Sequence, residues 1–454
     1  MATQAGRRIR LKGNYMRTST LLRSGGVILA ILVASPVFAE DPPSAAATAP
    51  AAAPAAPTPF IKFSGHAEIG MTAKTTNSAR TLNWGHLFTD RSTEPLVNQV
   101  VMTAQHDIDS SSKTANWGFK VQGLWGSDAR YTHTLGILNN ATDNINQFDI
   151  VEAHVDAHLP ILASGGVDVK AGIYPTLEGV EVIDATGNFF YSHNYIFNFG
   201  IPLKHTGIMT TTHFSHGIDI YLGVDSGVNT SFGIGGDTNG AAAFHGGIGF
   251  TIGKNVTVLA TTHIGPEDAR GAFDFGTPAK PINVNKALRY LNDIAITWKI
   301  TPKLTSSTDI NYIRDDGYKV SGGGISEQLV YAQSDYVSWG LRAEIWDDGN
   351  GYFVSAFPGN HDFVLNSFGL AATKSGIPNT AIFSNVATTY GAVTLGVNIK
   401  PKVPAITKNF SVLLRPEVRY DASLGSSRPF GLDATNTGTK KDQLTLGIDA
   451  IFGF

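Results

Sequence analysis

The chain has 454 residues, a formal net charge of −3, 49 glycines, 10% aromatic residues and no cysteine. Only 16% of the residues are charged, against about a quarter in an average globular protein, which is typical of glycine- and aromatic-rich β proteins. The lack of cysteine excludes disulfides and thiolate metal or redox sites. Beyond the N-terminal segment, no apolar run approaches the roughly 20 residues of a membrane-spanning helix, so any span must consist of strands.

Residues 1–39 have the three parts of a secretory signal peptide. A basic segment precedes an apolar stretch over residues 27–34, and Val37-Phe38-Ala39 fits a cleavage site. An arginine pair at residues 7–8 leaves a twin-arginine signal as an alternative, and Met16 is an alternative start. The pattern predicts an exported protein.

Residues 40–59 are rich in alanine and proline and cannot bury a core, so we interpret them as a periplasmic linker. Residues 60–454 then form the remaining domain. Because residues 1–39 carry six basic and no acidic residues, their removal changes the net charge from −3 to −9. That charge argues against nucleic acid as a partner.

From residue 60 onward, apolar and polar residues alternate, which is the pattern of strands with two different faces. The runs are about 9 to 13 residues long, whereas a strand in a soluble protein has about 5 to 6 and a tilted membrane strand needs about 9 to 11. Clear examples are residues 61–71, 117–125, 151–159, 337–345 and 410–421. A soluble β-sandwich also alternates, but strand length favours a membrane barrel.

Aromatic residues recur at a spacing that fits the two surfaces of a membrane. Trp117 and Trp125 share one strand face, as do Tyr290 and Trp298. Eight residues of strand span about 26 Å, close to the apolar band of about 25 Å that separates the aromatic girdles of outer-membrane barrels. These pairs therefore favour strands that cross a membrane.

Short and long connections alternate along the chain, as expected for a barrel with short periplasmic turns and long outer loops. The expected short links are residues 160–166, 215–217, 253–255, 301–303, 347–351 and 401–408. The expected long loops include residues 74–95, 127–146, 265–287, 358–384 and 422–441. We therefore predict a transmembrane antiparallel β-barrel of about 16 strands, within about two, with both termini periplasmic. The uncertainty comes from the weakly patterned residues 96–106 and 352–357.

The last strand alternates from Leu444 to a terminal aromatic residue, Phe454. This ending looks like the C-terminal signal by which outer-membrane barrels are recognised for insertion, so the barrel-assembly machinery is an expected partner. The alternative is a soluble sheet that closes with its last strand.

Residues 175–203 are expected to form the third outer loop. Three motif segments follow one another here: Gly172-Ile173-Tyr174-Pro175-Thr176-Leu177-Glu178-Gly179, then Asn188-Phe189-Phe190-Tyr191-Ser192, then Gly200-Ile201-Pro202-Leu203-Lys204-His205-Thr206-Gly207. This block resembles the putative beta-barrel porin-2 (OmpL-like) family, with Tyr191 where that pattern has serine. The resemblance covers residues 60–454 and implies a porin-type outer-membrane barrel without an established substrate or catalytic residue.

In general porins the third loop folds into the lumen. Here Glu178, Glu181 and Asp184 would then bring carboxylates to a constriction, because charged rings in a lumen select ions by sign. The expected opposing wall consists of Lys120, Lys170, Arg342, Arg415 and Arg419. The alternative is that the loop aromatics pack outside and the inward charges form ordinary cross-strand pairs.

Metal, cofactor and catalytic sites are not expected. His154 and His158 lie four residues apart on a strand, about 13 Å, which is too far for one metal ion. These residues, and His205 and His213 near another turn, are interpreted as hydrated lumen residues. No Gly-x-Ser-x-Gly nucleophile motif is present.

The predicted function is a channel in the outer membrane for passive diffusion of small hydrophilic solutes and ions. The expected partners are outer-membrane lipid, these solutes and, by analogy with general porins, two further copies in a homotrimer. Two alternatives stay open: a substrate-selective, sugar-type channel, and a barrel enzyme or adhesin with a filled interior. A barrel of about 16 strands favours an aqueous channel, since 8 to 12 strands would leave little room.

Overall fold

The computed structural model describes residues 60–75, 78–79, 81–139, 145–215, 217–233, 236, 239–357, 381–401 and 410–454. The predicted signal peptide (1–39) and linker (40–59) lie outside these ranges.

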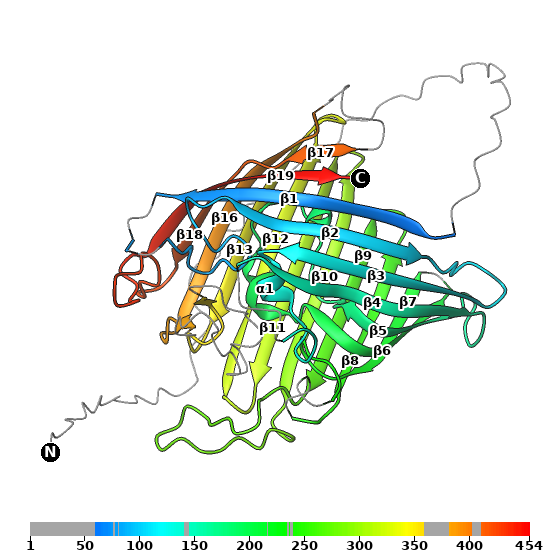
Figure 1. The fold of residues 1–454 in the computed structure, drawn as a ribbon, viewed down its shortest axis with the longest axis horizontal. Coiled ribbons are helices and arrows are strands. Elements are labelled where there is room, and N and C mark those ends of the chain that lie inside the picture. Colours follow the sequence, from blue (N-terminus) through cyan, green and yellow to red (C-terminus); the bar gives the residue numbers. More distant parts are fainter. Residues whose placement is uncertain are drawn as a thin grey trace. The chain divides into compact units, whose positions relative to one another are not determined.

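The described chain forms one large antiparallel sheet that closes on itself. In Figure 1, β19 lies beside β1, and their pairing from His66↔Gly453 to Lys74↔Thr445 closes the barrel. The strands are β1 (Lys62–Lys74), β2 (Leu96–His106), β3 (Asn116–Gly126), β4 (Gln147–Leu159), β5 (Val167–Pro175), β6 (Lys204–Phe214), β7 (Ile218–Asp225), β8 (Ala243–Ile252), β9 (Val256–Gly265), β10 (Arg289–Thr301), β11 (Leu304–Asp315), β12 (Val320–Ala332), β13 (Val337–Asp348), β16 (Thr388–Ile399), β17 (Ser411–Leu414), β18 (Glu417–Ser423) and β19 (Asp442–Gly453).

β17 and β18 are two halves of one barrel strand, because both pair with β16 and β19. The ladder is interrupted at Pro416, which has no N–H to donate, as expected for proline in a strand. Hydrogen bonds continue past the break, from Val397 N to Pro416 O (3.0 Å) and from Arg415 N to Asp449 O (3.0 Å). The barrel therefore has 16 strands, which confirms the predicted antiparallel β-barrel and its strand count.

The two faces of each strand differ as the alternation predicts. On β13, Trp339, Leu341 and Ile345 are exposed on the outer face, whereas Arg342 and Glu344 are buried on the inner face. An apolar outer face and a polar inner face are typical of a barrel that crosses a membrane.

The connections at one end of the barrel, which we call the turn end, are short, and those at the other, the loop end, are mostly long. Residues 96–106, weakly patterned in the sequence, are β2. Residues 352–357 are not a barrel strand, so the short link predicted at residues 347–351 is wrong. β13 ends at Asp348, and the residues after it begin a long loop-end connection to β16. Within it, β14 (Ser355–Ala356) pairs with β15 (Ile382–Phe383) in a separate sheet.

Asp348 explains why the chain leaves the wall at this point. Its carboxylate accepts hydrogen bonds from the backbone N–H groups of Tyr352 (2.9 Å), Phe353 (3.0 Å) and Val354 (2.9 Å). These donors are satisfied without a strand ladder, so the chain turns instead of pairing.

The described helices are all short, and none is long and apolar enough to cross a membrane. They are α1 (Ala129–Thr132), the 3₁₀-helix η1 (Ala185–Gly187) and the π-helix η2 (Ile196–Gly200).

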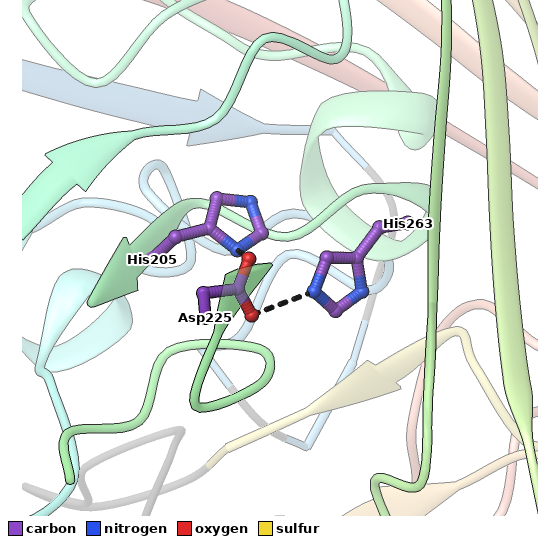
Figure 2. Close-up of side chains that lie close together, drawn as sticks. All are labelled: His205, Asp225 and His263. Atoms are coloured by element: carbon purple, nitrogen blue, oxygen red, sulfur yellow. Dashed lines mark hydrogen bonds and ion pairs between the residues drawn. The ribbon is translucent and has the colours of Figure 1, made fainter. Parts of the chain in front are cut away.

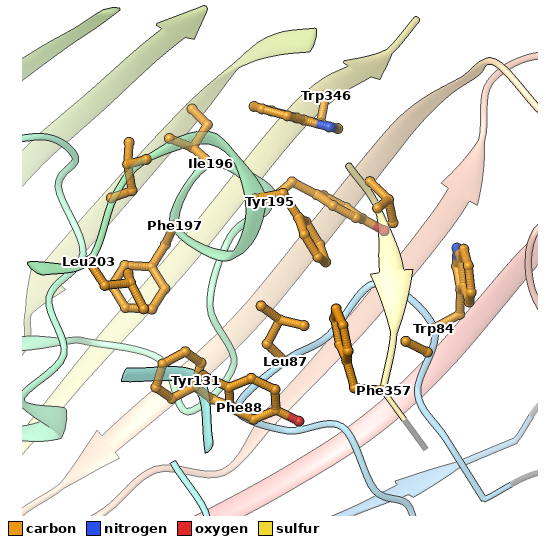
Figure 3. Packing of buried hydrophobic residues seen from close by; sticks show 14 of the residues in the cluster. Trp84, Leu87, Phe88, Tyr131, Tyr195, Ile196, Phe197, Leu203, Trp346 and Phe357 are labelled. Atoms are coloured by element: carbon orange, nitrogen blue, oxygen red, sulfur yellow. The ribbon is translucent and has the colours of Figure 1, made fainter. Parts of the chain in front are cut away.

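Loop-end segments build a buried apolar cluster of their own. Figure 3 shows Phe88 beside Tyr131, with Tyr195 and Phe197 from η2 and its flank nearby and Trp346 from β13. The Phe88 ring centroid lies 5.2 Å from that of Tyr131 and 5.3 Å from that of Phe197. The inward faces of the strands are mostly polar, as predicted, but inward strand residues such as Leu124, Leu291 and Trp346 join the loop residues in an apolar core.

The assigned faces can be tested with Leu341, which lies in the middle of β13 and is 42% exposed. Leu341→Arg places a charge against lipid and should lower the free energy of unfolding by about 2–4 kcal/mol. Leu424→Arg, one residue beyond β18, should cost only about 0–1 kcal/mol because it lies near the interface. Urea unfolding in lipid vesicles, followed by tryptophan fluorescence, measures both costs. Equal costs would contradict the assignment.

Candidate functional site

The segment between β5 and β6, residues 176–203, is called loop 3, and it crosses the interior of the barrel. Its backbone N–H groups donate to carboxylates on distant strands: Gly179 to Asp293 (3.0 Å), Val180 to Asp309 (3.1 Å) and Tyr195 to Glu344 (2.6 Å). These acceptors lie on β10, β11 and β13. Because β13 is eight strands from β5 in a barrel of 16, loop 3 reaches the opposite wall.

Three arginines on that wall bind the backbone carbonyls of loop 3. Arg342 donates to Ser192 O (2.7 Å), and Arg419 donates to His193 O (2.6 Å). Arg415 donates to the carbonyls of Ala185 and Asn188, both at 2.9 Å. A guanidinium group has five donors in a fixed fork, so it can bind a loop carbonyl and a carboxylate at once.

The same arginines are paired with buried acids. Arg342 lies 2.6 Å from Glu181 of loop 3, and Arg419 lies 2.8 Å from Asp421 and 3.2 Å from Glu344. Burying these charges without partners would cost several kcal/mol each, whereas the pairs and loop carbonyls satisfy them together. Loop 3 is therefore held by a network of charges rather than by isolated contacts.

The third arginine, Arg415, has two acidic partners. Its guanidinium lies 2.7 Å from Glu68 on β1 and 2.6 Å from Asp449 on β19. Since β1 and β19 form the closing pair of the barrel, this residue links loop 3 to the strands that close it.

Glycines on the wall make room for the aromatic residues of loop 3. A Cβ atom at Gly340 would overlap the ring of Phe189, and one at Gly396 would lie 2.9 Å from the ring of Phe190. Both glycines point inward, on β13 and β16, so the rings pack directly against backbone. The Asn-Phe-Phe segment singled out in the sequence thus packs inside the barrel.

The structure corrects the expected role of five predicted site residues. Glu178, Glu181, Arg342, Arg415 and Arg419 are all buried and do not face a water-filled passage. The reason is that Arg342 contacts Glu181 of the loop directly, whereas Arg415 and Arg419 pair with acids of the wall. These charges are therefore neutralised in contacts instead of facing each other across a gap.

The two buried glutamates of loop 3 differ in their surroundings. Although burial alone raises the pKa of a carboxyl group, Arg342 and His193 hold the pKa of Glu181 at about 2. Burial raises the pKa of Glu178 to about 8 despite the nearby His263, and, within the described chain, both carboxyl oxygens lack hydrogen-bond partners. Glu181 is thus a fixed charge in an ion pair, whereas Glu178 holds its proton at neutral pH.

The other predicted site residues are only partly buried and lie towards the turn end. Asp184 lines a cavity of about 420 Å³ together with His66 on β1. Lys120 on β3 and Lys170 on β5 line a second cavity of about 400 Å³, with Glu152 paired to Lys120 at 2.5 Å. The structure therefore places these three charges in two separate cavities.

Loop-end segments other than loop 3 also fold inward, which sequence reasoning missed. His86 lies 3.0 Å from Asp421 on β18, and Trp84 Nε1 donates to Tyr390 on β16 (3.2 Å). Arg130 in α1 forms a two-pronged pair with Asp90, at 3.0 and 3.1 Å. The sequence feature that indicates this inward fold is the Trp-Gly-His-Leu-Phe run at residues 84–88, which is unusual in an exposed polar loop.

A cluster of histidines with one aspartate lies at the loop end, beside the start of loop 3. His205, Asp225 and His263 come from β6, β7 and β9, and one potential metal-binding atom from each lies within 4.8 Å of the others. In Figure 2 the Asp225 carboxylate lies between the two imidazole rings. The spacing of histidines along single strands does not reveal this group, because its members come from different strands.

The family model for putative beta-barrel porin-2, OmpL-like, matches residues 60–454. An anion-selective porin from Comamonas acidovorans is 10% identical, with 87% of this chain and 99% of that chain covered and a TM-score of 0.52. OmpF from Salmonella typhi in complex with daunomycin is 9% identical, with coverages of 87% and 97% and a TM-score of 0.51. OprB from Pseudomonas putida is 12% identical, with coverages of 87% and 94% and a TM-score of 0.50. No curated protein sequence matches the chain.

The anchoring of loop 3 can be tested at Arg342. Arg342→Gln leaves Glu181 charged and buried without its partner, so the free energy of unfolding should fall by about 3–5 kcal/mol at neutral pH. Arg314→Gln is the matched control, because Arg314 is exposed and pairs with Asp316 at 2.8 Å on the surface. Its loss should cost no more than about 1 kcal/mol. The double variant Arg342→Gln/Glu181→Gln should recover part of the loss, and strict additivity in urea unfolding would contradict the pairing.

The same pair predicts an acid-sensitive loop. The pKa of Glu181 is lowered from 4.5 to about 2, so its contribution to stability is present above pH 4.5 and is lost as the pH falls through 2. Urea unfolding of the wild type should therefore lose stability over this window. Glu181→Gln should lose less over the same window, and identical pH profiles would contradict the assignment.

Proposed function

Since the chain belongs to the putative beta-barrel porin-2, OmpL-like family and is an outer-membrane channel of porin type, we propose that loop 3 forms its constriction. Small hydrophilic solutes and ions then cross by passive diffusion between loop 3 and the barrel wall. The observation that carries this proposal is the set of hydrogen bonds from loop 3 to β10, β11 and β13, on the far side of the lumen. A barrel of this size without an inserted loop would leave a wide aqueous channel.

The constriction is rigid in this proposal. The loop is anchored through carbonyls, amides and buried ion pairs, so lifting it would expose several unpartnered charges at once. The open channel should therefore conduct in steady, ohmic steps. Gating by loop 3 is not expected.

Ion preference in this proposal is set by the charges that stay partly exposed. Asp184, in the 420 Å³ cavity, attracts cations, whereas Lys120 and Lys170 attract anions within a 400 Å³ cavity that Asp107, Glu152, Asp156 and Asp168 also line. Lys120 is partly neutralised by Glu152 at 2.5 Å. Lys170 and Asp184 should therefore have the larger effects on selectivity.

A substrate-selective channel is the second candidate, because a cavity of about 240 Å³ lies at the loop end. Its walls include the rings of Phe199, Tyr318 and Tyr352, with Arg289 and Asp268 as polar groups. Apolar walls with a few converging polar groups are typical of small-molecule sites. This candidate predicts conductance that saturates with solute concentration and a weaker saturation in Tyr352→Ala.

Export by the cleaved signal, a homotrimeric assembly and recognition of Phe454 by the barrel-assembly machinery are part of the same proposal. Phe454 supports it by its position: its backbone pairs with Gly65 of β1 (3.0 and 3.2 Å), while half of its side chain stays exposed. A terminal ring at the closing edge of the barrel is accessible to a factor that completes this pairing.

Planar-bilayer recording tests the proposal. The purified protein should show stepwise ohmic conductance, and its absence across several salts and solutes would favour a barrel enzyme or adhesin instead. In a salt gradient, Asp184→Asn should shift the reversal potential towards anion preference and Lys170→Gln towards cation preference. Glu178→Gln is the matched control and should leave the reversal potential unchanged, since Glu178 is buried. A shift in the control alone would place the passage elsewhere.

A further inference from the structure

We propose that His205, Asp225 and His263 bind one divalent transition-metal ion, with His245 as a fourth ligand. These four residues are called the histidine cluster. The proposal does not depend on the path that solutes take through the barrel.

Strand register brings the histidine cluster together. His245 on β8 is directly opposite His263 on β9, and on the other side of β8, Gly223 of β7 is opposite His245. Asp225 lies two residues after Gly223 on β7 and on the same inner face. Its partner on β6 is Gly207, which is two residues from His205. Four consecutive strands thus each contribute one side chain at the loop end of the barrel.

The distances suit a metal site. His205 Nδ1 lies 3.1 Å from Asp225 Oδ2, and His263 Nε2 lies 3.0 Å from Asp225 Oδ1. Ligand bonds of about 2.0–2.1 Å in a tetrahedral zinc site place neighbouring ligand atoms roughly 3.3 Å apart. The three ligand atoms lie within 4.8 Å of one another, so only small side-chain shifts would be needed around an ion.

Several polar atoms of the histidine cluster lack hydrogen-bond partners in the described chain. They include both ring nitrogens of His245, His263 Nδ1, and the facing atoms His205 Nδ1 and Asp225 Oδ2, whose 3.1 Å contact lacks hydrogen-bond geometry. All four side chains are 0% exposed. A buried polar atom without a partner costs about 1–3 kcal/mol, so the arrangement needs a further binding partner, and a cation supplies one.

His245 lies beside the three residues of the 4.8 Å group and would join them as fourth ligand after a shift of its side chain. Its ring centroid lies 4.3 Å from that of His205 and 5.6 Å from that of His263. With Asp225, this gives three imidazoles and one carboxylate. Neutral imidazole and carboxylate ligands favour zinc, nickel, copper or cobalt over magnesium and calcium, which prefer oxygen ligands.

Groups around the histidine cluster would orient its ligands. Thr176 Oγ1 lies 3.2 Å from His205 Nε2, and Glu267 Oε1 lies 3.9 Å from His263 Nδ1. Gly227 N donates to Asp225 Oδ1 (2.8 Å). A carboxylate beside the free nitrogen of a ligating histidine is a common supporting arrangement in metal sites, and Glu267 would also offset the charge of the ion.

Two observations give the site a role and an entry path. Thr176 is the first residue of loop 3 and contacts His205, so a bound ion would tie the base of the loop to β6, β7 and β9. Glu267 and Val228, which are hydrogen-bonded to each other at 2.9 Å, line the 240 Å³ cavity at the loop end. An ion could reach the cluster from that cavity.

Metal binding is tested on the purified, folded barrel without a polyhistidine tag, stripped with a chelator and titrated with Co²⁺ and Zn²⁺. We expect one equivalent of Co²⁺ to give the intense visible absorption of a four-coordinate site, and one equivalent of Zn²⁺ to displace it and raise the unfolding temperature. No saturable binding at one equivalent, or only the weak spectrum of hydrated Co²⁺, would overturn the proposal and leave a metal-free cluster in which Asp225 forms ion pairs with His205 and His263.

Variants place the ion. Asp225→Asn and His263→Gln should weaken Zn²⁺ binding on the order of 100-fold or more, and Glu267→Gln about tenfold. His154→Gln is the matched control, because His154 lies on β4 between Glu152 and Asp156 and outside the histidine cluster. Unchanged affinity in Asp225→Asn, or equal loss in His154→Gln, would overturn the assignment. If the cluster variants do not fold, as judged by heat-modifiable migration in gels, the Co²⁺ spectrum of the wild type decides.

Discussion

The hydrogen bonds between charged side chains of the barrel wall and the backbone of loop 3 are the constraint on which the rest of the lumen depends. Loop 3 has little regular secondary structure, so most of its N–H and C=O groups need partners from elsewhere. The inward faces of the strands carry charges that also need partners once water is excluded. Arg342 and Arg419 bind loop carbonyls, and Glu344 binds a loop N–H. Each side thereby offsets the desolvation of the other.

This constraint also determines where charge can act on a solute. An arginine that binds a carboxylate forms a nearly neutral pair with it, so the pair exerts only a weak electrostatic force on an ion in the passage. The low-dielectric surroundings strengthen the contacts of the arginine with the carboxylate and the carbonyl instead. Arg415, between Glu68 and Asp449, is the clearest case. In the proposed channel, selectivity comes instead from charges with fewer contacts, such as Asp184. A count of inward charges along the strands would therefore misjudge the preference of the channel.

Much of the barrel could be predicted from the sequence, because strand alternation, strand length and aromatic spacing are local properties of the chain. The strand count was predictable for the same reason. The short link expected at residues 347–351 was wrong because Asp348 caps the next three amides through its side chain, which alternation does not reveal. The inward fold of the segment around Trp84 was missed because its partners, such as Asp421, lie more than 300 residues away.

The histidine cluster shows the same limit in its strongest form. His245 and His263 are 18 residues apart in sequence, yet register places them opposite each other. Every inward residue of a barrel has cross-strand neighbours at about 5 Å. Side chains that bind one ligand in a lumen are therefore expected on adjacent strands rather than along one strand. Histidines four residues apart on one strand are about 13 Å apart, too far for one ion. The proposed metal site instead takes its ligands from four adjacent strands. Sites of this kind are expected near the loop end, where inserted loops exclude water and make each unpartnered nitrogen or oxygen costly.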